Sequence, residues 1–233
     1  ASARESRPRA APVRLRAMTQ APPDSLPQLF AVLGDPIAHS RSPQMHAAAL
    51  AALGVPHRYM ALHVRDGELP EALRGVRALG LGGVNLTVPH KQPALEIVDS
   101  TTPAARRIGA INTVLVRQTE AGTRQLIGDN TDSPGFARAV RELGPAPVER
   151  AMVLGSGGAS RAIVDALLHE LRCKRLVWVT RKPTKLLAQP HIQALDRAGV
   201  ELVVTGYGQL ANHGRFDLLV NTTTVGMHGG PVA

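Results

Sequence analysis

The sequence predicts an α/β fold with two lobes, an N-terminal α/β lobe and a Rossmann-like, doubly wound second lobe. After residue 150, the runs "AMVLG", "RLVWV" and "VELVV" are hydrophobic almost throughout and alternate with helical stretches. Such strands are typical of a parallel sheet that helices cover on both faces. A glycine-rich turn, "GSGGAS" at 155–160, joins the first of these strands to a helix, which is typical of a nucleotide-binding lobe.

Helices of the first lobe are expected where apolar residues recur at helical spacing. Ser42-Pro43 and Thr102-Pro103 each place a capping residue before a proline, so helices are expected over 43–54 and 103–109. A third helix is expected over 68–80, and a short one over 93–99. In the helix over 68–80, one face holds Leu69, Leu73 and Val76.

Strands of the first lobe are expected where apolar runs end in turn residues. Three such runs predict strands at 29–34, 57–64 and 82–88. The segment 110–130 reads as a hairpin with Ala121 and Gly122 near its turn.

The second lobe begins at a bridging helix over 134–144, which Ser133 and Pro134 are expected to open. A linker follows at 145–150, and then about four strands. A full doubly wound sheet has about six strands, so this lobe is expected to be incomplete at its C-terminal end. The predicted division is 1–28 for an extension, 29–131 for a substrate-binding lobe and 132–233 for a nucleotide-binding lobe.

The formal net charge of +9 is unevenly distributed. Residues 1–17 hold five arginines and one acid, Glu5, in a segment rich in alanine and proline. A segment of this composition cannot bury a core, so residues 1–28 are predicted to be a disordered basic extension. A dispensable extension, with Met18 as a start, is favoured over a transit peptide or a nucleic-acid-binding arm.

The composition argues against several classes of protein. A single cysteine, Cys173, leaves no disulfide framework and no cysteine-rich zinc site, and it fits a reducing cytosol. No apolar run approaches the roughly 20 residues that span a bilayer. The nine histidines and the scattered acids show no ligand spacing, so no metal is expected. Aromatic residues are 3% of the chain and offer few stacking surfaces for bases, which argues against nucleic acid as a partner.

Polar residues interrupt the first lobe at several places. Asn85 and Thr87, within "GGVNLTVPHK" (82–91), are two positions apart and share one face of a strand, and Lys91 follows the strand end. The other polar spots are Ser40 and Ser42, Asn112 and Thr113, "GDNTD" at 128–132 and "NTTTVG" at 221–226. Each has a structural alternative, such as a helix cap at Ser42. Together they place neutral hydrogen-bonding groups beside a lysine, which suits a polyhydroxylated substrate.

The glycine-rich turn predicts a phosphate cradle. Gly155 allows the tight turn, Gly157 lets the backbone approach a pyrophosphate at the helix N-terminus, and Gly158 keeps the entry bare. Ser160 occupies the place of the last glycine of the common pattern, and an ordinary strand-to-helix turn is the alternative.

The next strand ends in Thr180, Arg181 and Lys182, with Lys185 close behind and no acid. Asp or Glu at this place suits the ribose hydroxyls of NAD, whereas Arg and Lys attract a 2′-phosphate. The cofactor predicted is therefore NADP, with a solvated basic loop as the alternative.

Six motifs occur in one order along the chain: "GDPIAHSRSP", "GGVNLTVPHK", "GAINTV", "GDNTD", "GSGGASRA" and "NTTTVG". With them, residues 29–230 resemble the shikimate dehydrogenase family, NADP-dependent enzymes of aromatic amino-acid biosynthesis. The resemblance implies a cytoplasmic enzyme, a monomer or homodimer, that reduces 3-dehydroshikimate reversibly to shikimate with NADPH.

The resemblance also implies roles for individual residues. Lys91 and Asp132 match the catalytic pair. Substrate-binding positions are Ser40 and Ser42 for the carboxylate and Asn85, Thr87 and Asn112 for the ring hydroxyls. Cofactor-binding positions are Gly155, Ser156, Gly157, Gly158 and Ala159 for the pyrophosphate, Thr180, Arg181 and Lys185 for the 2′-phosphate, and Thr222 and Val225 near the cofactor.

The chain departs from the family pattern at Ser133, where glycine is usual, and at Lys185, where arginine is more usual. A final family segment, with a tyrosine and a glutamine near the substrate, is not found. The alternatives are a quinate/shikimate dehydrogenase that uses NAD, or an NADP-binding fragment without turnover. His39 and His90 are alternative acid–base groups that the family pattern does not require.

Overall fold

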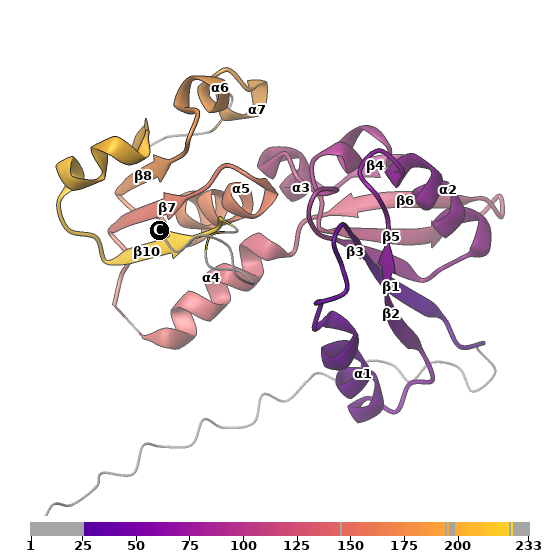
Figure 1. The fold of residues 1–233 in the computed structure, drawn as a ribbon. Coiled ribbons are helices and arrows are strands. Elements are labelled where there is room, and N and C mark those ends of the chain that lie inside the picture. The colour runs from indigo at the N-terminus through magenta and orange to yellow at the C-terminus, as the bar shows by residue number, and fades with distance from the viewer. Residues whose placement is uncertain (1–25, 145, 194, 196–198, 224, 226–233) are drawn as a thin grey trace, which may run out of the picture.

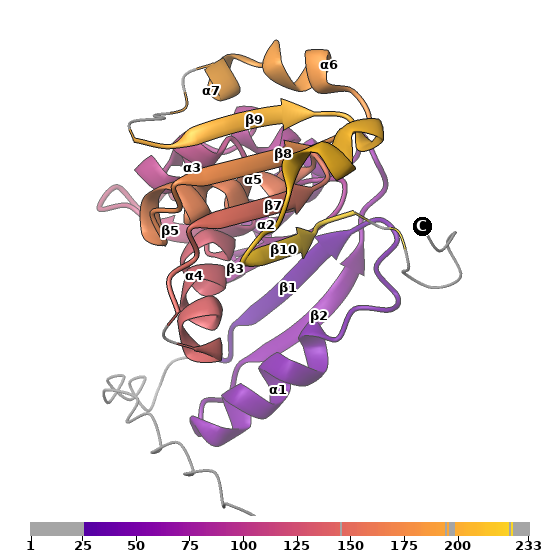
Figure 2. The same ribbon diagram turned by 90° about the vertical axis from the view of Figure 1, so that its left-hand side faces the viewer.

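The computed structural model describes residues 26–144, 146–193, 195, 199–223 and 225 (Figure 1). Most of the predicted basic extension, residues 1–25, lies outside the described residues. Two sheets lie side by side in the structure, and helices cover both of them (Figures 1 and 2). The predicted fold class, α/β with two lobes, is confirmed.

The first sheet has six strands in the order β2-β1-β3-β5-β6-β4. Its strands are β1 (Leu29–Gly34), β2 (Arg58–His63), β3 (Gly83–Leu86), β4 (Ser100–Thr101), β5 (Thr113–Gln118) and β6 (Arg124–Asp129). Strand β1 is parallel to β2 and β3, whereas β5 pairs antiparallel with β3 and β6. The predicted hairpin is therefore confirmed as β5 and β6. Its turn contains Gly122, whose φ of 78° favours glycine.

Buried and half-buried side chains alternate along β3, and this alternation defines the two faces of the first sheet. Val84 and Leu86 are buried in the apolar core, while Asn85 between them is half-buried on the opposite face. The helix α2 closes the core with Leu69, Leu73 and Val76, all buried as its spacing predicts. The first lobe thus has one apolar face for its core and one polar face.

The second sheet has four parallel strands in the order β10-β7-β8-β9. They are β7 (Arg150–Leu154), β8 (Arg175–Val179), β9 (Glu201–Thr205) and β10 (Leu218–Asn221). Trp178 on β8 is fully buried in the core of this lobe. Strands β7 and β8 are the predicted continuous apolar runs, and both are buried along most of their length.

Seven α-helices connect these strands in the part of the chain that the structure describes. They are α1 (Ser42–Ala52), α2 (Leu69–Leu79), α3 (Pro103–Ile108), α4 (Asp132–Leu143), α5 (Gly158–Asp165), α6 (Pro183–Leu187) and α7 (Pro190–Gln193). Helix α4 runs from the first sheet to the second, and α3 of the first lobe packs against α5 of the second (Figure 1). No helix within the described ranges is long and apolar enough to cross a membrane.

Three short helical segments complete the fold. Two are 3₁₀ helices, at Pro93–Glu96 and at Tyr207–His213. The third, Ala166–Glu170, is a π-helical turn that continues α5. The predicted short helix over 93–99 is thus a 3₁₀ helix that ends earlier than expected.

Two predicted helix starts are wrong, and one is right. Helix α1 begins at Ser42 itself, which does not cap it, because proline is tolerated within the first turn. Helix α4 likewise begins at Asp132, so Ser133 lies inside the helix and is buried. Thr102 does cap α3, because its Oγ1 accepts a hydrogen bond from the backbone N–H of Ala105 at 3.2 Å.

Candidate active site

An ion pair at the predicted site joins the first lobe to the start of the second. Nζ of Lys91 donates to Oδ2 of Asp132 over 2.6 Å, and both side chains remain partly accessible, at 17% and 32%. Lys91 lies in the turn that follows β3, and Asp132 is the first residue of α4. A lysine in this position can give or take a proton, and a carboxylate at this distance orients its ammonium group.

Asn112 holds the other oxygen of the carboxylate. Its Nδ2 donates to Oδ1 of Asp132 at 2.7 Å and to Oγ1 of Thr131 at 3.0 Å, while its Oδ1 accepts the Thr131 N–H at 2.9 Å. The structure therefore brings Asn112 directly to the Lys91–Asp132 pair. Because Asn112 is only 7% exposed, these bonds fix the orientation of its amide.

Asn130 connects the start of α4 to the backbone at Ala110. Its Oδ1 accepts the backbone N–H of Asp132 at 3.1 Å, and its Nδ2 donates to the carbonyl of Ala110 at 2.9 Å. The side chain is 2% exposed, so it stabilises the local backbone and is not accessible to a bound substrate.

Asn85 belongs to the same network. Its Nδ2 donates to Oγ1 of Thr113 at 3.1 Å and to the carbonyl of Asn112 at 3.3 Å, and its Oδ1 accepts the hydroxyl of Tyr59 at 2.7 Å. His46 stacks on the Tyr59 ring, with centroids 3.9 Å apart. Burial raises the pKa of Tyr59 to about 12 and lowers the pKa of His46, so both rings are uncharged near neutral pH.

The loops after β1 and β3 leave the sheet together. The N–H of Asp35 donates to the carbonyl of Val88 at 2.9 Å, which joins the two loops just beyond the strand ends. Thr87 lies at the start of one loop and is half-buried. In the other loop, Oγ of Ser40 accepts the N–H of Ser42 at 3.3 Å. Neighbouring loops thus carry Ser40, Ser42 and Thr87, and none of the three bonds directly to the Lys91–Asp132 pair within the described residues.

His90 is a core residue. It is 1% exposed, and its Nε2 lies 2.8 Å from the carbonyl of Val64. The ring is therefore inside the first lobe and has a backbone partner of its own. In the described part of the chain, no cluster of three or more metal-ligating side chains occurs.

The glycine-rich turn follows β7 as predicted, and Gly155 has a φ of +113°, which favours glycine. A Cβ at Gly155 would also lie 2.5 Å from Oγ1 of Thr222, which itself donates to the carbonyl of Leu154 at 2.6 Å. Trp178 holds the turn from the core side, since its Nε1 donates to the carbonyl of Gly155 at 2.6 Å. Packing on both sides therefore fixes the turn.

Ser156, Gly157 and Ala159 lie at the open side of the turn. Ser156 accepts a hydrogen bond from Oγ1 of Thr180 at 3.0 Å, which ties the turn to the end of β8. Gly157 precedes the first residue of α5, and a Cβ there would meet nothing within 4 Å. Ser160 is buried, and its hydroxyl donates to the carbonyl of Gly157 at 2.7 Å. The approach to the N-terminus of α5 is therefore open.

Exposed cations follow β8. Arg181 and Lys185 are exposed, and neither forms an ion pair with an acid among the described residues. The sequence has no Asp or Glu from 175 to 190. Val225, which follows β10 in the sequence, is also exposed. An open helix N-terminus beside unpaired cations fits a dinucleotide with a 2′-phosphate, so the residues present fit NADP.

Gly158 brings the glycine-rich turn into contact with Lys91. A Cβ at Gly158 would lie 2.9 Å from Cβ and 3.2 Å from Cδ of Lys91, and 3.5 Å from Cβ of Ala110. The aliphatic part of Lys91 therefore lies directly on the first residue of α5. The two halves of the predicted site are in contact.

A second ion pair between the lobes joins a half-exposed arginine to a buried aspartate. Nε of Arg107 on α3 donates to Oδ1 of Asp165 on α5 at 2.6 Å, and the hydroxyl of Ser133 donates to Oδ2 of Asp165 at 2.7 Å. The Asp165 side chain is 2% exposed, and its hydrogen bond raises the pKa of Arg107. Ser133, which departs from the family pattern, thus helps to satisfy a buried carboxylate.

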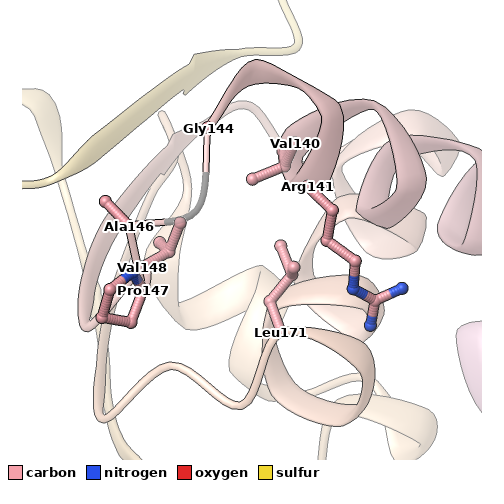
Figure 3. A pocket seen from close by; sticks show the side chains of 7 residues that line it. All are labelled: Val140, Arg141, Gly144, Ala146, Pro147, Val148 and Leu171. Carbon is pink, nitrogen blue, oxygen red and sulfur yellow. The ribbon is translucent and has the colours of Figure 1, made fainter. Parts of the chain in front are cut away.

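A surface pocket lies elsewhere on the second lobe, between the C-terminal end of α4 and the segment that precedes β7 (Figure 3). It is lined by Val140, Arg141, Gly144, Ala146, Pro147, Val148 and Leu171. None of these is a predicted site residue, and most are apolar.

Comparisons with known proteins agree with this geometry. Residues 32–114 match the family model described as the shikimate dehydrogenase substrate binding domain. The NADP(+)-type shikimate dehydrogenase of Bacillus mycoides (strain KBAB4) is 38% identical over 205 residues, which cover 86% of this chain and 70% of that protein. The chain belongs to the shikimate dehydrogenase family.

Solved structures of related proteins place the chain in the same fold. Shikimate 5-dehydrogenase from Thermus thermophilus, in complex with NADP(H) and shikimate, is 41% identical with a TM-score of 0.70, covering 85% of this chain and 69% of that one. Ligand-free 5-ketofructose reductase of Gluconobacter sp. strain CHM43 is 28% identical with a TM-score of 0.68, covering 86% and 70%. The shikimate dehydrogenase fold is therefore also found in a reductase that is named for another substrate.

Sequence reasoning missed four residues that shape this shikimate dehydrogenase site. They are Tyr59, Asn130, Arg161 and Trp178. Asn130 lies within the "GDNTD" motif and Arg161 within "GSGGASRA", so their motifs could have pointed to them. Tyr59 and Trp178 lie in ordinary strands, and no local signal in the sequence marks their contacts.

Proposed function

We propose that the chain is an NADP-dependent shikimate dehydrogenase, which reduces 3-dehydroshikimate to shikimate in a reversible reaction. The observation that carries the proposal is the Lys91–Asp132 pair at 2.6 Å, with Lys91 packed on Gly158 of the glycine-rich turn. Family membership supplies the reaction class, and this contact puts an acid–base group beside the predicted cofactor turn.

When bound, NADPH would supply a hydride to the ketone carbon of the substrate. The ketone oxygen must then gain a proton as the C=O bond becomes an alcohol. Lys91 donates that proton from Nζ, and Asp132 orients the ammonium group and balances its charge. In the reverse direction, Lys91 takes the proton back from the alcohol. Both residues are positioned for this exchange before substrate arrives, because Asn112 fixes the carboxylate.

The remaining polar residues are proposed to bind substrate. Ser40 and Ser42, on the loop after β1, are assigned to the carboxylate. Asn85, Thr87 and Asn112 are assigned to the ring hydroxyls. Asn112 and Asn85 already make hydrogen bonds within the protein, which hold each amide in one orientation. Asn85 keeps one acceptor position on its Oδ1 for a ring hydroxyl, whereas Asn112 would exchange one of its protein partners for the substrate.

The second lobe is proposed to bind the cofactor. Gly155, Ser156, Gly157, Gly158 and Ala159 are assigned to the pyrophosphate at the N-terminus of α5. Thr180, Arg181 and Lys185 are assigned to the 2′-phosphate, and Thr222 and Val225 are assigned positions near the cofactor. Hydrogen bonds from Trp178 and Thr222 hold the backbone on either side of the turn, which supports a preformed site.

The proposal also covers the domain division, the partners, the oligomeric state and the location of the protein. Residues 29–131 would be the substrate-binding domain and residues 132–233 the cofactor-binding domain. The partners would be small molecules rather than nucleic acid or membrane, in a monomer or homodimer. A buried free thiol at Cys173 suits a reducing compartment, and the proposed location is the cytoplasm.

The test is cofactor consumption with defined substrates. The chain is mixed with 3-dehydroshikimate and either NADPH or NADH, and the nicotinamide absorbance is followed. Turnover with NADPH that exceeds turnover with NADH supports the proposal. Preference for NADH would favour the quinate/shikimate enzyme that uses NAD, and cofactor binding without turnover would favour a binding role.

A further inference from the structure

Arg161 is a buried cation that no reaction step above uses. It lies on α5, three residues after Gly158, and is 7% exposed. Its Nη1 donates to the carbonyl of Gly109 at 2.8 Å, and its Nη2 donates to Oε1 of Gln189. Within the described residues it has no carboxylate partner, and its Nε has no hydrogen-bond partner.

Burying a guanidinium that has no carboxylate partner lowers the stability of the fold. Burial lowers the pKa of Arg161 to about 10, because two neutral oxygens replace water around the charge. The first turn of a helix also disfavours a cation. A guanidinium in this setting contributes little net stability, so its geometry is the more informative feature.

The carbonyl that Arg161 holds belongs to a short segment that bonds to both members of the Lys91–Asp132 pair. Gly109 ends α3 in the left-handed conformation, with φ of 69°, and the buried residues Ala110, Ile111 and Asn112 follow. The N–H of Ile111 donates to the backbone carbonyl of Lys91 at 2.7 Å. The side chain of Asn112 donates to Asp132 at 2.7 Å. One segment thus holds the backbone of Lys91 and the carboxylate of Asp132.

Packing at the same place connects the two lobes independently of Arg161. Ile108, Ala110 and Ala162 form a small buried apolar cluster between α3 and α5. Gly158 lies against the aliphatic part of Lys91 and against Ala110. The first turns of α5 therefore rest on the segment 108–110 and on Lys91, and the ribbon shows α3 beside α5 (Figure 1).

We propose that Arg161 is a positioning residue, which couples the cofactor-binding helix α5 to the Lys91–Asp132 pair through the Gly109 carbonyl. It touches neither substrate nor cofactor in this account. Its role is to hold segment 109–112 in register, so that Lys91 stays at hydrogen-bonding distance from Asp132. This inference rests on the function proposed above and adds a residue to it.

Arg161→Met and Arg161→Gln test the proposal, because methionine cannot donate and glutamine is too short to reach the carbonyl in the same way. A displacement of about 1 Å in a catalytic group can cost roughly 10²-fold, so we expect kcat to fall about 10- to 100-fold with both KM values nearly unchanged. Arg161→Lys keeps one donor and should restore part of kcat. Arg138→Met, an exposed arginine of α4, is the matched control and should leave kcat unchanged.

A second readout does not depend on turnover. Lys91, Lys174, Lys182 and Lys185 are the four lysines of the sequence, so lysine side-chain NMR signals can be assigned from single Lys→Arg variants. In the ligand-free protein, Arg161→Met should move the Lys91 signal and leave that of Lys174 in place. A moved Lys91 signal in a chain whose wild type lacks turnover would support the coupling and reject the proposed function.

Three results would overturn the coupling. The first is a folded Arg161→Met or Arg161→Gln protein with wild-type kcat and an unmoved Lys91 signal. The second is a loss of NADPH affinity in proportion to the loss of kcat, which would make Arg161 a cofactor-binding residue. The third is a lowered melting temperature as the sole effect, which would make it a structural residue only.

Discussion

Nζ of Lys91 lies 2.6 Å from Oδ2 of Asp132, although 41 positions separate the two residues in the sequence. The pair joins the turn after β3 to the first residue of α4, the helix that leads into the second sheet. Because Lys91 also packs on Gly158, the Lys91–Asp132 pair, the start of the bridging helix and the glycine-rich turn meet at one point. The proposed function depends on this contact between the two lobes.

Asp132→Asn should lower kcat about 10- to 100-fold, because the amide keeps the shape but no longer balances the charge of Lys91. NADPH affinity should stay close to wild type. Glu142→Gln, an exposed acid on the same helix, is the control and should behave like wild type. Steady-state kinetics measures the change, and an Asp132→Asn enzyme with full kcat would remove Asp132 from the mechanism.

Arg181→Ala should weaken NADPH binding about tenfold or more and leave NADH binding unchanged, since a hydrogen bond to a charged group contributes about 1.5–3 kcal/mol. Trp178 is the single tryptophan of the chain and donates to the glycine-rich turn, so we expect its fluorescence to change when the cofactor binds. Lys174→Ala, an exposed lysine paired with Glu149, is the control. Equal losses for NADPH and NADH would contradict the assignment of Arg181 to the 2′-phosphate.

Gly158→Ala should lower kcat more than it lowers cofactor affinity, because the new Cβ would press on Cβ of Lys91 at 2.9 Å. We expect a loss in kcat of about tenfold or more, as for other small displacements of a catalytic group. The control is Gly135→Ala in α4, where a Cβ would meet nothing within 4 Å. If Gly158→Ala changed NADPH affinity alone, the contact between Gly158 and Lys91 would have no role in catalysis.

Cys173 should resist thiol reagents in the folded protein. It is 1% exposed, and burial raises the pKa of its thiol to about 11 from an ordinary value of 9.0. Between these values the unfolded chain loses the proton and the folded chain keeps it, so the free energy of unfolding should fall as pH rises through this window. Labelling rates, and denaturation at several pH values beside Cys173→Ser, measure both effects. Rapid labelling of folded protein at neutral pH would contradict the burial.

Local patterns in the sequence predicted the parts of the fold that depend on neighbours along the chain. The apolar face of α2, the Thr102 cap and the hairpin of β5 and β6 each follow from a few adjacent residues. The starts of α1 and α4 were misjudged by one or two residues, because a proline is compatible with more than one position in a first helical turn.

The contacts that build the site were not predictable in the same way. The role of the Lys91–Asp132 pair came from the family resemblance, and spacing alone does not bring these residues together. The bonds from Tyr59 to Asn85, from Trp178 to Gly155 and from Arg161 to Gly109 form only when separate elements are packed. Such contacts depend on the tertiary arrangement, to which short-range patterns are insensitive.

The most direct test of the central claim is the rate of NADPH oxidation with 3-dehydroshikimate for the wild-type chain and for Lys91→Ala, with Trp178 fluorescence as the check on NADPH binding. Loss of a general acid should lower kcat about 10²- to 10⁴-fold while the Kd for NADPH stays near the wild-type value. A Lys91→Ala protein that turns over at the wild-type rate would contradict the account.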